Sequence, residues 1–285
     1  MRRIIVNADD FGLCGDVTRG ILDAHRNGQV SSTTLMVNMP GTDEAVEVAR
    51  QHPNLGVGLH FNLTEGRPLT DVPSLVDSDG RFLLRGDLLR RGLRRAIDPM
   101  DVRREFAAQL ERIHDLGIAP THVDSHQHVH MAPWIIRAMA PLLAGGVARL
   151  RLARPPGRPP GTLQLPASTV RHASMSIAAR QVRRRFPGLT NDRLVSLHLL
   201  PSGRRWTASA YPEVVEWTDP SDLVEVMVHP FAPGSDLEEM YREDPIREVR
   251  LAFARQCWRE HELLASEAEP PFDRDLYHLV TWSEA

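Results

Sequence analysis

Lysine is absent from the 285-residue sequence, and all 34 of its basic residues are arginine. This absence excludes two kinds of chemistry, because Schiff-base catalysis and phosphate binding by a P-loop both use a lysine side chain. The sequence also lacks a G-x-G-x-x-G motif after its first strand-like run. The usual indication of a dinucleotide-binding fold is therefore missing.

Cysteine is scarce as well. Cys14 and Cys257 lie far apart in the sequence, so they indicate neither a disulfide framework nor a C-x-x-C metal site, and this suits a reducing compartment. No apolar run reaches the ~18 residues of a membrane span. Met1 leads directly into a strand-like run with no signal peptide. We therefore expect a cytoplasmic protein. Its net charge of -3 gives no electrostatic reason to expect a nucleic-acid partner.

Strand-like and helical patterns alternate along the chain, which has 42% hydrophobic and 25% charged residues, as ordinary globular proteins do. We expect strands at 3–8, 30–37, 55–61, 121–124, 148–152, 193–199, 223–229 and 276–282. We expect helices at 16–26, 43–51, 88–96, 101–116, 134–143, 168–185 and 243–265. This alternation predicts a parallel sheet with helices outside. About seven βα units favour a (β/α) barrel, with some irregularity, over an open sheet.

Two stretches interrupt the alternation. Residues 62–99 contain several glycines and prolines, and insertions of this length are usually functional loops or lids, so we expect this one over the mouth of the fold. Residues 155–166 are rich in proline and predict a loop. No repeat or linker composition divides the chain, so we predict a single domain over residues 1–285.

Four of the 13 histidines fall within residues 121–130, Thr-His-Val-Asp-Ser-His-Gln-His-Val-His. The segment has the pattern of a short strand that runs into a loop, which is where parallel α/β proteins place their chemistry. Imidazole is also the commonest metal ligand in proteins. The alternative is a polar loop of structural histidines. We expect His122 and His130 to be structural, while the role of His128 stays open.

Further candidate groups lie at the ends of other predicted strands. They are Asp9 and Asp10 after the first strand, His60 after the third, Asp124 and His126 after the fourth, and His229 before the last long helix. These residues should converge, because the carboxyl ends of all strands in a parallel barrel lie on one face. One carboxylate and two imidazoles can hold a metal with open positions, and an adjacent carboxylate can act as base toward an activated water. The alternative is that the aspartates merely end a strand and cap a helix.

Four segments carry a resemblance to a known family. They are residues 7–12 (Asn-Ala-Asp-Asp-Phe-Gly), 58–64 (Gly-Leu-His-Phe-Asn-Leu-Thr), 121–130 and 225–230 (Glu-Val-Met-Val-His-Pro). In order and spacing they resemble the signature blocks of the YdjC-like carbohydrate deacetylases, the ChbG group. The resemblance implies a distorted (β/α) barrel related to the polysaccharide deacetylases. It also implies removal of acetyl groups from N-acetylated sugars with the help of one divalent cation.

The resemblance further implies roles for single residues. Asp10, His60 and His126 would hold the cation, Asp9 would be the general base, and His229 would protonate the departing amine. Two imidazoles and one carboxylate suit zinc, nickel, cobalt or manganese better than magnesium, although magnesium stays open.

Three neighbouring residues complete the predicted site. We expect Asp124 to orient a ligand or catalytic histidine from behind. Arg151, near the end of the fifth strand, would meet a carboxylate such as Asp9 or the product acetate, or else form a surface salt bridge. Gln127 stands where family members often have a third histidine, a position to which we assign no metal.

The expected substrate is an N-acetylglucosamine oligosaccharide or a related glycoconjugate such as a glycolipid, and the family makes a homodimer plausible. Two other functions stay open: a metal-dependent phosphoesterase or other amidohydrolase, and a non-catalytic sugar-binding relative. Barrel amidohydrolases usually carry His-x-His at the end of the first strand, where this chain has Asp9 and Asp10. The presence of every expected catalytic residue argues against a non-catalytic relative.

Overall fold

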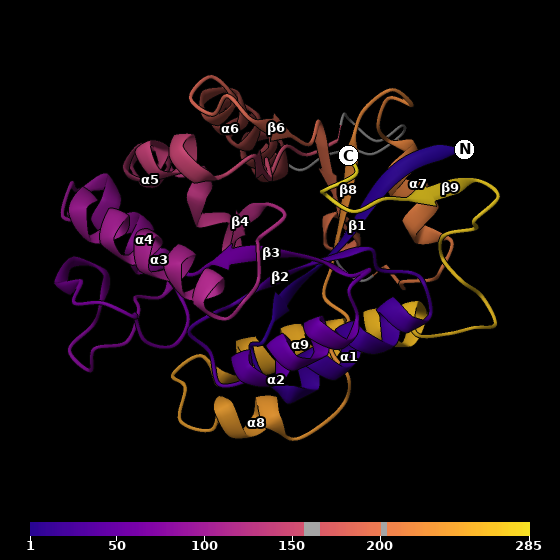
Figure 1. The fold of residues 1–285 in the computed structure, drawn as a ribbon, viewed down its shortest axis with the longest axis horizontal. Helices are drawn as coiled ribbons and strands as arrows, with labels where there is room; N and C mark the ends of the chain where they lie inside the picture. The colour runs from indigo at the N-terminus through magenta and orange to yellow at the C-terminus, as the bar shows by residue number, and fades with distance from the viewer. Residues whose placement is uncertain (157–165, 201–203) are drawn as a thin grey trace.

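A parallel β-sheet forms the centre of the protein in the computed structural model, and helices surround it (Figure 1). The structure describes residues 1–156, 166–200 and 204–285, with the side chains of 166–174 left aside. The strands of the described residues are β1 (Arg2–Phe11), β2 (Ser32–Leu35), β3 (Gly56–Phe61), β4 (Val123–Ser125), β5 (Arg149–Leu150), β6 (Leu189–Thr190), β7 (Arg193–Val195), β8 (Val224–Val228) and β9 (Tyr277–Leu279). All their pairings are parallel.

The strand order is β6-β5-β4-β3-β2-β1-β8-β7, and β9 pairs with the start of β1. The two ends of this path, β6 and β7, are joined by Asn191 and Asp192 alone, so the sheet curves round until its ends meet. Side-chain and main-chain hydrogen bonds replace a regular ladder at this seam. The Asn191 side chain accepts from Leu152 N at 2.6 Å and donates to Leu152 O at 3.1 Å, and Leu194 N donates to Arg154 O at 2.7 Å. The predicted irregular barrel is confirmed, with eight strands along the path where we expected about seven.

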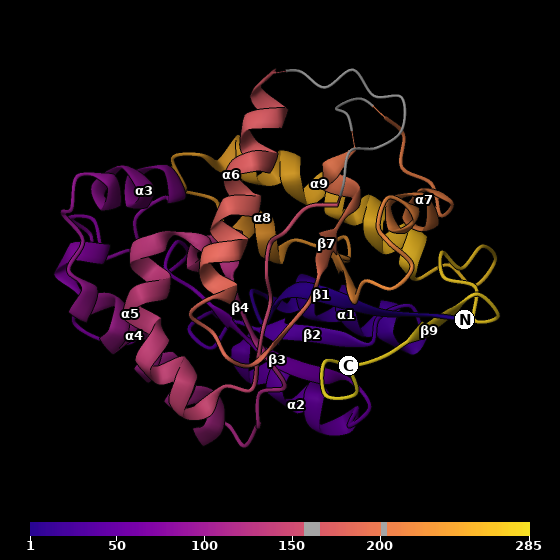
Figure 2. The ribbon, with the colours of Figure 1, turned by 90° about the horizontal axis from the view of Figure 1, so that it is seen from above.

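Helices pack on the outside of this barrel (Figure 2). They are α1 (Gly15–Arg26), α2 (Thr42–Gln51), α3 (Arg85–Leu93), α4 (Pro99–Asp115), α5 (Pro133–Gly146), α6 (Pro166–Arg183), α7 (Ala210–Glu216), α8 (Asp236–Met240) and α9 (Arg247–Leu264). Helix α1 illustrates why they form: Val17, Ile21 and Ala24 recur at helical spacing and are all fully buried. None of the described helices combines the length and the apolar character needed to cross a membrane.

The short elements differ most from the expectations. The predicted strand at 193–199 ends at Val195, and residues Leu197–Leu199 form a 3-10 helix, η3. Ser196 begins that turn, because its hydroxyl accepts a hydrogen bond from His198 N at 3.3 Å. The predicted loop after β4 is another 3-10 segment, η2 (His126–Met131). Helices α7 and α8 were not predicted, since five to seven residues are too few for a periodic pattern.

The insertion at 62–99 is ordered by α4 and contains η1 (Pro73–Leu75) and α3. Glu105 of α4 accepts hydrogen bonds from Leu69 N at 3.0 Å and from Thr70 N at 3.1 Å. Gln109, one turn later, holds both main-chain groups of Asn62, with distances of 2.9 and 2.8 Å. The insertion is thus fastened to a helix of the barrel. The proline-rich stretch at 155–166 falls almost wholly outside the described residues.

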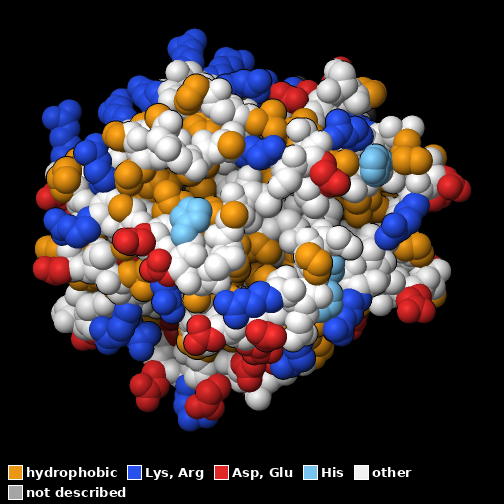
Figure 3. Space-filling model, viewed as in Figure 1, with side chains coloured by type: hydrophobic (Ala, Val, Ile, Leu, Met, Phe, Trp, Pro, Cys, Tyr) orange, Lys and Arg blue, Asp and Glu red, His pale blue; other side chains and the backbone are white. Residues whose placement is uncertain are grey.

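Charge is mixed over the surface. On the face seen in Figure 3, arginine and acidic side chains lie among scattered hydrophobic ones, and basic side chains gather along the upper edge of the view.

Candidate active site

An irregularity in β1 brings Asp9 and Asp10 to the same side of the sheet. Neighbouring residues of a regular strand point to opposite faces. Here Ala8 pairs with Thr33 and Phe11 with Leu35, so β1 holds one more residue than β2 between these points. Asp10 takes up this bulge with a φ of 69°. As a result both carboxylates line one pocket and are buried, with 2% and 3% of their surfaces exposed.

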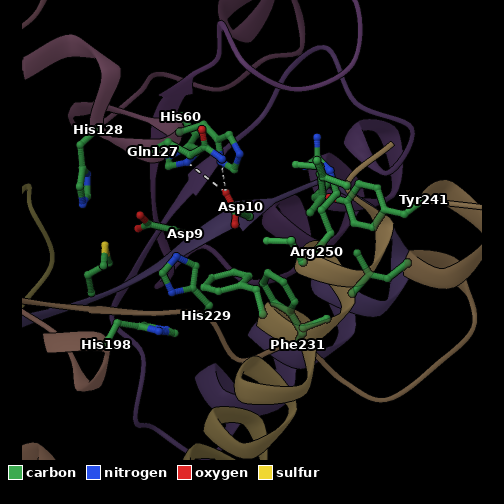
Figure 4. Close-up of a pocket in the computed structure, with 18 residues that line it drawn as sticks. Asp9, Asp10, His60, Gln127, His128, His198, His229, Phe231, Tyr241 and Arg250 are labelled. Carbon is green, nitrogen blue, oxygen red and sulfur yellow. Dashed lines mark hydrogen bonds and ion pairs between the residues drawn. The ribbon is translucent and has the colours of Figure 1, made fainter. Parts of the chain in front are cut away.

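Two imidazoles converge on one oxygen of Asp10 (Figure 4). The Asp10 Oδ1 atom lies 3.1 Å from His60 Nε2, at the end of β3, and 2.9 Å from His126 Nδ1, at the start of η2. The ligand atoms of these three residues lie within 4.8 Å of one another. The structure therefore brings together the three residues for which the sequence predicted metal binding.

Asp124 orients one of these imidazoles. Its Oδ1 lies 2.7 Å from His60 Nδ1, and Thr34 Oγ1 lies 3.0 Å from the same nitrogen. A proton on Nδ1 that is donated to Asp124 leaves the Nε2 lone pair facing Asp10. A carboxylate behind a ligating histidine is the arrangement common at metal sites, because it sets the tautomer and the ring orientation.

The charges of the trio indicate that this place favours a cation. Burial alone would raise the pKa of Asp10, but the charges and hydrogen bonds of His126 and His60 hold it well below the usual range. Burial would lower the pKa of His60, yet Asp124 and Asp10 raise it to about 10. Positive charge between these carboxylates is thus strongly favoured, and two nitrogens with one oxygen suit a transition-metal ion. The donor set fits a divalent cation.

Arg151 stands behind the site and joins three carboxylates. Its Nη1 and Nη2 atoms each lie 2.6 Å from a different oxygen of Asp9, in a forked contact. Nη1 also lies 2.5 Å from Asp124 Oδ2, and Nη2 lies 2.6 Å from Glu225 Oε1. The arginine has no exposed surface. It therefore meets Asp9, one of the two partners we expected, and it is not a surface ion pair.

Glu225 was not singled out from the sequence. It is fully buried on β8, and burial raises its pKa to about 7 even though the Arg151 charge opposes the shift. A charged residue within the otherwise apolar strand Val-Glu-Val-Met-Val was the available signal, since such residues are almost never buried without a partner.

His229 follows β8 and lines the pocket together with His198, which sequence reasoning missed. Glu260, which was also missed, is fully buried beside these two histidines. Glu260, on α9, accepts a hydrogen bond from the main-chain N of His229 at 2.6 Å and from Tyr211 OH at 3.0 Å. Its Oε2 lies 3.8 Å from His229 Nδ1. Burial lowers the pKa of His229, but Glu260, Asp10 and Asp9 outweigh it and raise the pKa.

The remaining histidines of the cluster separate by position. His128 lines the pocket in a left-handed conformation, with a φ of 56°. His122 is buried away from the pocket, where its ring stacks on Trp282 at 4.7 Å. His130 is buried between Ser125 and the carbonyl of Arg151. The environments of His122 and His130 are those of structural residues, as expected.

The pocket has a volume of about 480 Å³ and two unlike walls. The aspartates and histidines form one wall. The opposite wall is largely apolar and comes from the loop between β1 and α1, the segment after β8, the region of α8, and α9. It includes Leu13, Phe231, Leu237, Tyr241, Val249 and Phe253. None of the residues 62–99 lines the pocket, but Glu65 approaches its rim and pairs with Arg250, which does line it.

Comparisons with known proteins relate the chain to one family. The profile of the family described as "YdjC-like protein" matches residues 3–269. A carbohydrate deacetylase of Geobacillus stearothermophilus is 45% identical over 201 residues, which are 69% of this chain and 73% of that protein. A chitooligosaccharide deacetylase of Yersinia pestis is 46% identical over 152 residues, which are 53% of this chain and 59% of that protein.

A crystal structure shares the fold. A protein of Enterococcus faecalis V583, described as a cellobiose-phosphate cleavage protein, superimposes with a TM-score of 0.68. The match covers 99% of this chain and 98% of the other, at 24% sequence identity. With the family profile covering nearly the whole chain, the resemblance of the four sequence blocks is confirmed, and this protein belongs to the YdjC-like family.

Proposed function

We propose that this protein is a metal-dependent carbohydrate deacetylase, which hydrolyses the acetamide of an N-acetylated sugar. The observation that carries the proposal is the place of Asp9. Its carboxylate makes a bidentate contact with Arg151. It lies next to the Asp10–His60–His126 trio and lines the same pocket as His229. The deacetylase names of the relatives point to the same reaction.

Asp10, His60 and His126 would hold one divalent cation, of zinc, cobalt, nickel, manganese or magnesium. When bound, such a cation polarises a carbonyl oxygen and makes water more acidic. The remaining work falls to side chains of the chain itself.

Asp9 is the base in this proposal. Arg151 grips both of its oxygens, and Asn7 Nδ2 donates to Oδ1 at 3.0 Å, so the carboxylate has a single orientation. A fixed base within reach of the attacking water removes the water's proton as the carbon–oxygen bond forms.

His229 is the acid. An amine leaves poorly unless its nitrogen is protonated, so a proton must reach that nitrogen as the carbon–nitrogen bond breaks. The raised pKa of His229 keeps its ring protonated more readily than an ordinary histidine. The products are acetate and the amino sugar, with one proton taken up by Asp9 and one given by His229.

The substrate we propose is an N-acetylglucosamine oligosaccharide or a related glycoconjugate. The polar wall would receive the acetamide, and the apolar wall offers a surface for a sugar face or for the apolar part of a glycolipid. A cytoplasmic location and a homodimer, both expected above, belong to the same proposal.

The test is acetate release from a panel of N-acetylglucosamine oligosaccharides and glycolipids. The protein is stripped of metal, and zinc, cobalt, nickel, manganese or magnesium is added back singly. We expect metal-dependent release, and we expect Asp9→Asn to lose at least about 10²-fold in kcat while it binds the same amount of metal.

Two results would contradict the proposal. Absence of bound metal under all conditions would remove the predicted centre. One bound metal without acetate release, but with cleavage of phosphoesters, would assign the site to a phosphoesterase.

A further inference from the structure

Glu260 is a buried carboxylate whose charge needs a partner. It has no exposed surface, and its pairing partners within the described part of the chain are two histidines. Its Oε2 lies 3.5 Å from His198 Nε2 and 3.8 Å from His229 Nδ1. A charged carboxylate this deep is costly unless a positive charge accompanies it, so a proton on one of the two imidazoles is favoured.

The two histidines are competitors for this charge. Both line the pocket, His198 from η3 and His229 from the end of β8, and their rings meet edge to face at 5.2 Å. Phe253 contacts both rings, at 5.2 and 5.3 Å. His198 Nε2 and His229 Nδ1 are both buried and have no hydrogen-bond partner among the described residues. The Glu260 carboxylate lies within ion-pair distance of both nitrogens.

Glu260 itself is firmly placed. Tyr211, fully buried, donates to Oε1, and the main-chain N of His229 donates to Oε2. The two histidines outweigh burial and bring the pKa of Glu260 down to about 2, so the carboxylate stays charged. Cys257, one turn earlier on α9, is buried nearby and carries no charge.

Resting on the proposed function, we propose that Glu260 is a positioning residue that holds one proton on the His198–His229 pair. His198 competes with the acid His229 for this carboxylate and so weakens the interaction between Glu260 and His229. The charged groups that face His229 are Asp9 and Asp10 from β1, His198 from η3 and Glu260 from α9. The other neighbours of the ring, Phe231 and Phe253, are uncharged.

The arrangement predicts opposite effects for two substitutions. Glu260→Gln removes the negative charge and should lower the pKa of His229, so the alkaline limb of the kcat/KM profile moves down by about one pH unit. His198→Asn removes the competitor and should move the same limb up. The double variant should resemble Glu260→Gln, because His198 acts through Glu260.

The experiment follows the pH profile of acetate release and, separately, the titration of the His229 ring by NMR in the full chain loaded with zinc. The NMR arm does not depend on turnover, so it decides the inference even if no substrate is cleaved. His261→Asn is the matched control, because His261 lies on α9 next to Glu260 but pairs with Asp23 outside the pocket. We expect no shift for this variant.

Three results would overturn the inference: no shift in either variant, shifts in the same direction, or a second zinc ion bound per chain that His198→Asn removes. Thermal unfolding identifies a misfolded variant. If Glu260→Gln does not fold, the upward shift in His198→Asn decides alone. Failure of the proposed function is a different result, namely no acetate release by the unaltered protein.

Discussion

At the scale of single residues, the centre of this protein depends on Arg151. The guanidinium is the common partner of Asp9, Asp124 and Glu225, and all four side chains are buried. It orients Asp9, the proposed base, and it contacts Asp124, the carboxylate that lies behind His60. The Arg151 guanidinium therefore orients both the proposed base and the carboxylate behind His60.

We expect Arg151→Met to reduce the free energy of unfolding by about 3–5 kcal/mol, because it leaves the buried carboxylates of Asp9 and Glu225 without their counter-charge and Asp124 with His60 alone. Urea denaturation of the metal-free protein measures this loss. The matched control is Arg193→Met, which breaks a partly exposed pair with Asp222 at 3.2 Å and should cost less than about 1 kcal/mol. A loss no greater than that of the control would show that Arg151 is not the organising charge.

At the scale of elements, the bulge in β1 and the helix α4 do different work. The bulge at Asp10 shapes the candidate site, because without it Asp9 and Asp10 would point to opposite faces of the sheet. Helix α4 instead holds the insertion, through Glu105 and Gln109. Stability of the insertion and chemistry of the site should therefore be separable.

Glu105→Gln tests this separation. Leu69 N and Thr70 N donate to different oxygens of Glu105, and the new amide replaces one of these acceptors by a donor, so we expect a loss of about 1–3 kcal/mol in unfolding free energy. Metal binding should not change, since no residue of 62–99 lines the pocket. Glu111→Gln, an exposed position on the same helix, should stay within about 0.5 kcal/mol. Weakened metal binding in Glu105→Gln would mean that the insertion supports the site directly.

At the scale of the whole molecule, buried neutral histidines predict the response to acid. Burial lowers the pKa of His122 to about 3 and that of His130 to about 4, from an ordinary value of 6.5. Below pH 6.5, His122 and His130 bind protons in the unfolded chain but stay neutral in the folded chain. Each of them therefore contributes stability that is present above pH 6.5 and is lost as the pH falls toward the folded value.

The substitution His122→Asn removes one of these two pH-dependent contributions to stability. We expect the variant to be less stable than the unaltered protein at pH 7, because it loses the stack on Trp282. Between pH 6 and 4, its stability should fall less steeply by about 1.4 kcal/mol per pH unit. Urea denaturation of the chelator-treated protein at several pH values measures both effects. His278→Asn, at an exposed ring, should keep the original slope, and an unchanged slope in His122→Asn would refute the assignment.

Much of the fold and of the site is predictable from local patterns. The alternation of strands and helices follows from side-chain periodicity, and it led to a parallel barrel. Polar residues that interrupt apolar runs at strand ends pointed to Asp10, His60, His126 and His229. In a parallel barrel these ends must meet, so their convergence could be expected without coordinates.

The sequence by itself thus determined which strand ends carry the carboxylates and imidazoles of the candidate site, because each of these residues lies within a few positions of its own strand. Tertiary structure alone decided which residues contact these groups. Glu260 reaches His229 from a helix 31 residues away, His198 arrives from a turn whose strand proved shorter than expected, and Asp9 joins Asp10 through a bulge. Such contacts depend on the curvature of the sheet and the placement of helices, and no local pattern records them.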